Sequence, residues 1–159
     1  ESAGTQNGNH LQRQANPYAD FHTSNFIVKR NIMLRYPFDE RFIHYGYEDV
    51  LWGKNLKDNH ISILHVDNLL GYEHFIGNMS FIRKTEESLH TLYQFRTELQ
   101  GYSRIISYAG KLKRCRLYPL CQHLFPLLSL PIKARLTGNK PSIFLFNIYK
   151  LLYYIHLDI

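Results

Sequence analysis

The stretch Phe38–Gly53 reads FDERFIHYGYEDVLWG and decides how the rest of the chain is interpreted. Two adjacent carboxylates, Glu48 and Asp49, follow a glycine that permits a tight turn, and they stand at the start of a helix predicted over Glu48–Asn59. Neighbouring helical residues point about 100° apart, so the two acids can serve different partners. A helix start also favours the ionised form, which keeps a base ready at neutral pH. Alternatively, both acids only cap the helix and complement its dipole.

Short apolar runs on either side of this stretch predict β-strands. Phe26–Val28, Ile61–Val66 and Leu69–His74 are the three candidates, the first two being rich in β-branched residues. Beyond them the spacing of apolar residues changes to a helical period. The predicted helices cover Asn78–Leu99, Ser103–Arg114, Tyr118–Leu130 and Ser142–His156, with Pro126 and Pro131 breaking the third. We therefore predict a linker or loop over residues 1–20, an α/β part over 21–100 and a helical extension over 101–159.

Composition and charge narrow the class of protein. A chain of 159 residues with 45% hydrophobic and 20% charged residues is typical of a folded domain and not of a disordered one. Its two cysteines are too few for a disulfide framework, which favours reduced thiols and a cytoplasmic location. Residues 1–100 carry a net charge of 10 − 12 = −2, whereas residues 101–159 carry 9 − 1 = +8.

The basic extension suggests a membrane surface as its partner. Its charges are interleaved with the apolar stretches Leu117–Ile132 and Ile143–Leu157, which fits an anionic lipid surface better than a nucleic acid. Fifteen helical residues reach about 22 Å, short of the hydrocarbon core of roughly 30 Å, so we expect helices that lie on the inner face of the membrane. Alternatively, these helices pack on the rest of the chain or on a second copy.

The order of the motifs from Phe21 to His74 resembles the second half of the catalytic domain of family 2 glycosyltransferases, and the related galactosyltransferase C-terminal region. The motifs are Thr-Ser-Asn before a strand, Lys-Arg after it, Phe-Asp-Glu-Arg-Phe, Tyr-Gly-Tyr-Glu-Asp-Val, and finally Tyr-Glu-His. The resemblance implies a partial Rossmann-like A-type α/β fold, the acceptor-side half of the domain. It also implies a nucleotide-sugar donor, a divalent cation (Mn²⁺ or Mg²⁺) and inversion at the anomeric carbon.

The resemblance also implies roles for individual residues. Asp49 would be the general base that deprotonates the acceptor hydroxyl, and Glu48 would hold the acceptor sugar. His74 would complete the metal site, although a histidine after a strand is also commonly a packed or surface residue. Asn25 and Arg30 would line the cleft near the donor, with turn capping as the alternative for Asn25.

Three further residues are candidates for binding sugar. Tyr47 and Trp52 could form an apolar platform for a sugar ring; core packing is the favoured role for Trp52 and an open alternative for Tyr47. Asp39 falls in a loop that could approach the acceptor.

The chain departs from the family pattern in one respect. No two aspartates stand two positions apart, so the Asp-x-Asp motif that grips the nucleotide diphosphate through the cation is absent. We therefore expect an inverting glycosyltransferase acting on a carbohydrate or glycolipid acceptor, of which this chain lacks the donor-binding half and is inactive alone. The alternative is a non-catalytic, truncated relative that binds a membrane or a partner through its basic helices.

Overall fold

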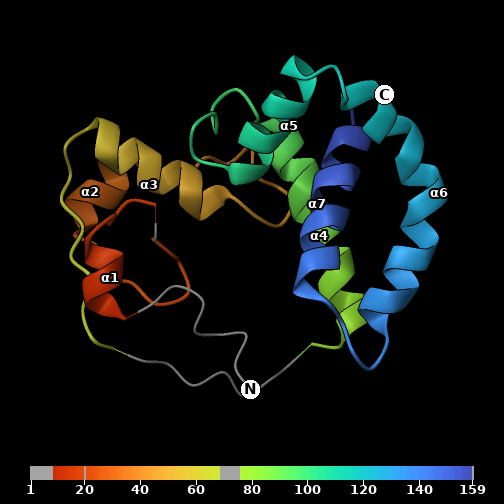
Figure 1. The fold of residues 1–159 in the computed structure, drawn as a ribbon. Helices are drawn as coiled ribbons and strands as arrows, with labels where there is room; N and C mark the ends of the chain where they lie inside the picture. Colours follow the sequence, from red (N-terminus) through yellow and green to blue (C-terminus); the bar gives the residue numbers. More distant parts are fainter. Residues whose placement is uncertain (1–8, 20, 69–75, 159) are drawn as a thin grey trace. The chain divides into compact units, whose positions relative to one another are not determined.

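The computed structural model describes residues 9–19, 21–68 and 76–158, and every regular element in these ranges is an α-helix (Figure 1). The chain divides into two compact units. The first comprises Glu1–Ile43 and Tyr47–Phe75, and the second comprises His44–Gly46 and Ile76–Ile159.

The predicted Rossmann-like α/β fold is wrong for the part of the chain that the structure describes, because that part contains no β-strand. The predicted strands Phe26–Val28 and Ile61–Val66 are extended, and their residues alternate between partly buried and exposed. Ile63 faces the core whereas Leu64 is 77% exposed. The extended conformation agrees with these apolar runs, but a strand also needs a paired neighbour, and no described segment supplies one. The third candidate, Leu69–His74, lies outside the described residues.

A glutamine side chain holds the extended segment Ile61–Val66 in place of a neighbouring strand. The backbone N–H of His65 donates to Gln14 Oε1 at 2.7 Å, and Gln14 Nε2 donates to the carbonyl of Ile63 at 3.2 Å. The ring of His65 also lies 3.0 Å from the carbonyl of Pro17. These contacts satisfy part of the backbone that a sheet would otherwise pair.

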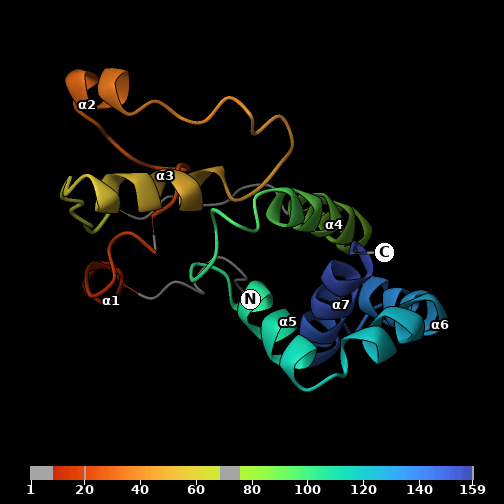
Figure 2. The ribbon, with the colours of Figure 1, turned by 90° about the horizontal axis from the view of Figure 1, so that it is seen from above.

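The first unit is built around one aromatic core. Its helices are α1 (His10–Gln14), α2 (Arg30–Arg35) and α3 (Glu48–Asp58), and Figure 2 shows α3 between the other two. Phe21, Trp52 and Leu56 are buried at its centre, and most of the remaining packing comes from the connecting segments. Helix α1 falls within the predicted loop and α2 was not predicted at all, since five or six residues are too few to show a helical period.

The second unit is a bundle with α7 at its centre. It contains α4 (Asn78–Gln94), α5 (Arg104–Arg114), α6 (Tyr118–Thr137) and α7 (Ile143–His156). Helix α7 packs against each of the other three, as Figures 1 and 2 both show. Tyr149, Leu152 and Ile155 of α7 are buried. The apolar stretch Ile143–Leu157 therefore packs into the bundle with part of its surface, whereas Ile143 and Phe144 are exposed.

Helix α6 continues through both prolines that were predicted to break it. Pro126 and Pro131 each remove one backbone hydrogen bond, and both residues are exposed. Figure 1 shows α6 curving along the outside of α7. The inward residues Phe125 and Leu136 hold the helix against the core despite these missing bonds. Packing thus outweighs the local cost of proline here.

Candidate functional site

Asp49 stands in the first turn of α3 and is reachable from solvent. Its side chain is 20% exposed, and one carboxylate oxygen, Oδ1, accepts the backbone N–H of Val50 at 2.8 Å. The other oxygen, Oδ2, lies 3.1 Å from Nδ1 of His22, whose side chain is 46% exposed. The imidazole donates to the carboxylate when Nδ1 carries the proton. Asp49 is therefore an oriented carboxylate rather than a freely rotating one.

A left-handed turn introduces the two acids. Gly46 has φ +105°, and Tyr47, the residue before α3, has φ +68°. A bulky residue with positive φ is uncommon and carries strain, and such positions cluster at functional sites. The carbonyl of Tyr47 accepts the N–H of Leu51, so the strained residue also closes the first turn of the helix.

Glu48 carries an unsatisfied buried atom. Its Oε2 is buried, and no hydrogen-bond donor reaches it from the described residues. Leaving a buried acceptor without a donor costs about 1–3 kcal/mol, and more when the group is charged. If the side chain turned this oxygen outward, the hydroxyl of a ligand could supply the missing donor. Of these two adjacent acids, Asp49 is partly exposed and held by a histidine, whereas Glu48 has an oxygen to which no described residue donates.

The remaining polar candidates of the first unit have local roles in the structure. Asn25 is exposed and donates from Nδ2 to the carbonyl of Asn68 at 3.2 Å. Arg30 is the exposed first residue of α2. Asp39 is bound by Arg41, whose Nε and Nη2 donate to its two oxygens at 3.0 and 2.6 Å. These hydrogen bonds hold the pKa of Asp39 below its ordinary value.

The two aromatic candidates differ in access. The indole of Trp52 is only 3% exposed and packs against the rings of Phe21, Phe26 and Phe38. Its Nε1 donates to the carbonyl of Tyr36 at 2.7 Å. The structure thus places Trp52 in the core, with no ring face open to a sugar, whereas Tyr47 is half-buried.

Metal binding is not supported by the residues that the structure describes. Among them, no group of three or more His, Cys, Asp or Glu side chains could hold a metal ion. His74, the expected ligand, lies outside the described residues. The divalent cation therefore stays a prediction, and the chemistry below uses no step through it.

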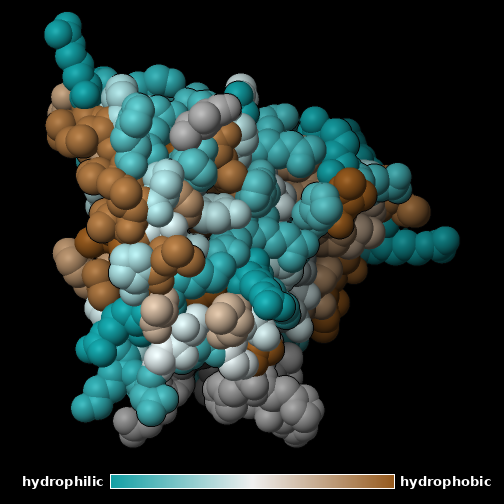
Figure 3. Space-filling view, turned by 90° about the vertical axis from the view of Figure 1, so that its right-hand side faces the viewer, coloured by the Kyte–Doolittle hydropathy of each residue, from teal (hydrophilic) through white to brown (hydrophobic). Residues whose placement is uncertain are grey.

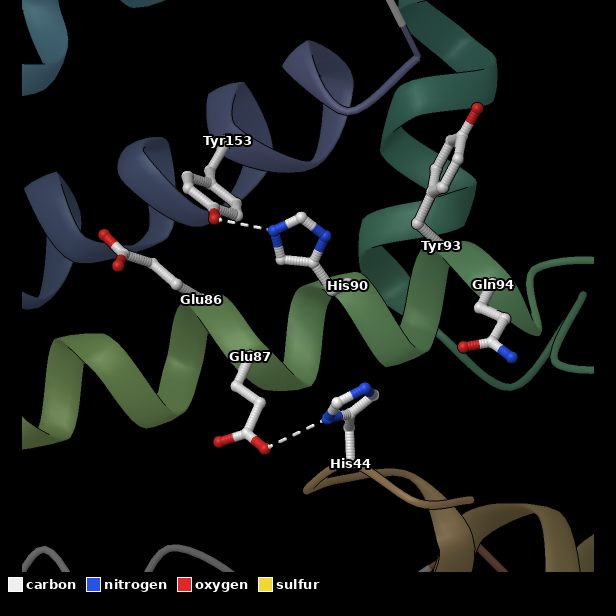
Figure 4. Close-up of a pocket in the computed structure, with 7 residues that line it drawn as sticks. All are labelled: His44, Glu86, Glu87, His90, Tyr93, Gln94 and Tyr153. Carbon is white, nitrogen blue, oxygen red and sulfur yellow. Dashed lines mark hydrogen bonds and ion pairs between the residues drawn. The ribbon is translucent and has the colours of Figure 1, made fainter. Parts of the chain in front are cut away.

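A pocket of about 530 Å³, lined by polar and aromatic side chains, lies within the second unit (Figure 4). Figure 4 shows Glu86 and His90 of α4 projecting toward α7, while Glu87 projects toward His44. The lining residues are His44, Glu86, Glu87, His90, Tyr93, Gln94 and Tyr153. His90 Nε2 lies 3.0 Å from the hydroxyl of Tyr153, and His44 Nδ1 lies 3.8 Å from Glu87 Oε1. These groups can exchange hydrogen bonds with a small polar molecule.

The charges around this pocket are partly balanced by the protein itself. Glu86 accepts from the Nζ of Lys133 at 2.7 Å and from the hydroxyl of Tyr149. Burial, and then the charge of Glu86, raise the pKa of Tyr153. Glu87 accepts the N–H of Tyr45 at 3.1 Å. Both carboxylates therefore serve first to tie neighbouring segments to α4.

Residues His44–Gly46 are fixed on α4 by close contact. The hydroxyl of Thr91 donates to the carbonyl of Tyr45 at 3.0 Å. A Cβ on Gly46 would lie 2.6 Å from the Cβ of Ser88, so only glycine permits this approach.

Sequence reasoning missed His22 and the whole second-unit pocket. The spacing of Glu86 and His90, four residues apart, could have suggested one helix face, but it gave no sign of Tyr153. Comparison with family models, curated proteins and solved structures found no match for this chain. The chemistry of both places is therefore inferred from their own geometry.

Proposed function

We propose that the chain supplies the acceptor side of an inverting glycosyltransferase, which transfers a sugar from a nucleotide-sugar donor to a glycan or glycolipid. Asp49 is the base for the acceptor hydroxyl, and Glu48 is a second ligand for the acceptor. The observation that carries the proposal is the pair at the start of α3: an oriented, reachable carboxylate next to a buried carboxylate oxygen to which no described residue donates. The resemblance of Phe21–His74 to family 2 glycosyltransferases supports the same assignment.

The proposed reaction is a direct displacement. The acceptor oxygen forms a bond to the anomeric carbon while the bond from that carbon to the phosphate oxygen breaks. The hydroxyl proton passes to the carboxylate of Asp49, and the nucleoside diphosphate leaves with inversion at the sugar. His22 holds Asp49 Oδ2, which leaves the carboxylate in one orientation for the incoming hydroxyl. A positioned base of this kind contributes about 10²–10⁴ in rate.

The test compares sugar transfer by the protein expressed from its own gene with transfer by its Asp49→Asn form. Labelled UDP-, GDP- and CMP-sugars serve as donors and glycans of the producing cells as acceptors. The amide keeps the size of the side chain and an acceptor for Val50, so we expect turnover to fall about 10²–10⁴-fold without unfolding. Glu48→Gln should instead raise the KM for the acceptor. The 159 residues alone should transfer no sugar, since they lack an Asp-x-Asp motif.

A matched control is Asp58→Asn, which makes the same change on the same helix. Asp58 is 55% exposed and pairs with Lys54 four residues earlier, far from the start of α3. The turnover of the Asp58→Asn form should equal that of the wild-type protein. Equal turnover of the Asp49→Asn form would reject Asp49 as the base, and no transfer from any donor of the panel would reject the enzymatic function.

A further inference from the structure

The outward side of α6 is apolar over most of its length. Successive residues of a helix turn by about 100°, and the buried Phe125 and Leu136 mark the side that faces the core. The exposed leucines of the other side are Leu120, Leu127 and Leu130, here called the leucine face of α6, and Leu128, 37% exposed, lies at its edge. Leu127 and Leu130 are 74% and 76% exposed. The stretch Tyr118–Ile132 contains no Asp, Glu, Lys or Arg, and the exposed polar residue on this side is His123.

An exposed apolar face of this kind, interrupted by His123, is a candidate docking surface. Single exposed leucines are ordinary on soluble proteins, but a row of them without charges in between is not. The fifteen uncharged residues extend over about 22 Å along the helix axis. Figure 3 looks at the side of the molecule where Figure 1 places α6, and it shows brown apolar surface between teal hydrophilic side chains.

Basic residues stand at both ends of the leucine face. Arg114 and Arg116 come shortly before α6, whereas Arg135 lies in its last turn and Lys140 follows it. All four are exposed. Residues 101–159 carry 9 − 1 = +8 in total. Long basic side chains beside an apolar face can keep their charges at headgroup level while their stems lie on apolar surface.

We propose that the leucine face of α6 binds an anionic membrane, with the helix in the plane of the interface and its basic ends against lipid phosphates. The positive charge of residues 101–159 favours an anionic lipid surface over a second copy of the chain as the occupant of this face. Two copies would bring two strongly positive segments together, whereas an anionic lipid surface attracts each of them. Among the described residues no helix is long and apolar enough to cross a bilayer. The inference goes beyond the proposed sugar transfer and does not depend on it.

The test is co-sedimentation of the 159-residue chain with phosphatidylcholine vesicles, with and without phosphatidylglycerol. We expect binding to the anionic vesicles that weakens at high salt, and little binding to the neutral ones. Leu127→Glu should reduce binding at least about tenfold, because it removes one leucine from the interface and adds a negative charge. The matched control is Leu64→Glu in the first unit, where the leucine is 77% exposed; it should bind as the wild type does.

A second variant tests the charges without touching the apolar face. Replacing Arg114 and Arg135 by glutamine should lower binding to anionic vesicles about 25-fold, since each basic residue near the surface contributes about fivefold. Circular dichroism checks that each variant stays helical.

Three outcomes would overturn the inference. They are no sedimentation with anionic vesicles, equal losses in the Leu127→Glu and Leu64→Glu forms, and a dimer in analytical ultracentrifugation that Leu127→Glu dissociates. The last result would assign the face to a second copy of the chain.

Discussion

Replacing Trp52 by alanine is expected to destabilise the first unit by about 3–5 kcal/mol, the usual cost of removing a large buried aromatic side chain. The indole is 3% exposed, and its ring centroid lies 4.8 Å from Phe38, 5.1 Å from Phe21 and 5.8 Å from Phe26. A cavity at this point would remove the common contact of three rings. Because α3 carries both Trp52 and the two acids of the candidate site, the site should lose its order together with the core.

A second substitution separates the packing of the ring from its hydrogen bond. Trp52→Phe keeps an aromatic ring but removes the N–H that donates to the carbonyl of Tyr36 at 2.7 Å. An acceptor left without its donor costs about 1–3 kcal/mol, so this variant should be less destabilised than the alanine variant.

Amide hydrogen exchange followed by mass spectrometry measures both variants. A loss of 3 kcal/mol or more lowers protection by about 100-fold or more, and peptides of α3 should show it. Peptides of α7, whose residues pack in the second unit, provide an internal reference. Less than about a tenfold change in α3 for Trp52→Ala would refute the assignment of this residue as the centre of the core.

Two further predictions concern glycines and an acid near the end of the chain. Gly53→Ala should destabilise the first unit by about 1–3 kcal/mol, because its Cβ would lie 2.6 Å from a backbone oxygen. The Cβ of Gly110→Ala would meet nothing within 4 Å, so this substitution should stabilise the second unit by about 0.5–1 kcal/mol. Urea unfolding of the pair checks both signs, and equal shifts would contradict the close approach at Gly53. The hydrogen bond from Tyr93, and then that from Tyr118, lower the pKa of Asp158 from its ordinary 3.8. Its stabilising contribution is therefore present above the unfolded-state pKa and is lost as pH falls through the lower folded-state value. Thermal unfolding against pH should show this acid loss in the wild type and not in Asp158→Asn, with an effect of at most about 1 kcal/mol because solvent screens the group; identical profiles would contradict it.

The long helices could be predicted from the sequence because their period of apolar residues repeats several times. The predicted helix Glu48–Asn59 is confirmed to within one residue as α3, and α5 and α7 begin one residue after their predicted starts. Helix α4 stops at Gln94, five residues before its predicted end at Leu99. Helix α6 runs seven residues further than predicted, because its contacts with the core, which the sequence does not display, outweigh two prolines.

The strands could be predicted only in part. An extended conformation is favoured by the β-branched residues of Ile61–Val66 themselves, although its exposed positions include the apolar Leu64 and Val66. Pairing is a property of two segments, and the partner that the structure gives this segment is the side chain of Gln14. A pattern of propensities cannot reveal such a substitute.

In the candidate sites too, features set by neighbouring residues could be predicted, whereas contacts between residues far apart in the sequence could not. Glu48 and Asp49 are at a helix start, as the glycine before them predicts. His22 reaches Asp49 across 27 residues, and Tyr153 reaches His90 across 63. Contacts over such separations depend on tertiary packing, which a single sequence does not specify.

The central place of α7 has a consequence for the order in which the second unit forms. The ribosome makes α4, α5 and α6 first, and the helix that all three pack against is made after them. Until α7 emerges, the apolar sides of the earlier helices have no common partner and stay open to chaperones or to aggregation. The second unit therefore completes its core only after α7 has emerged, and its yield in a cell depends on protection during that interval.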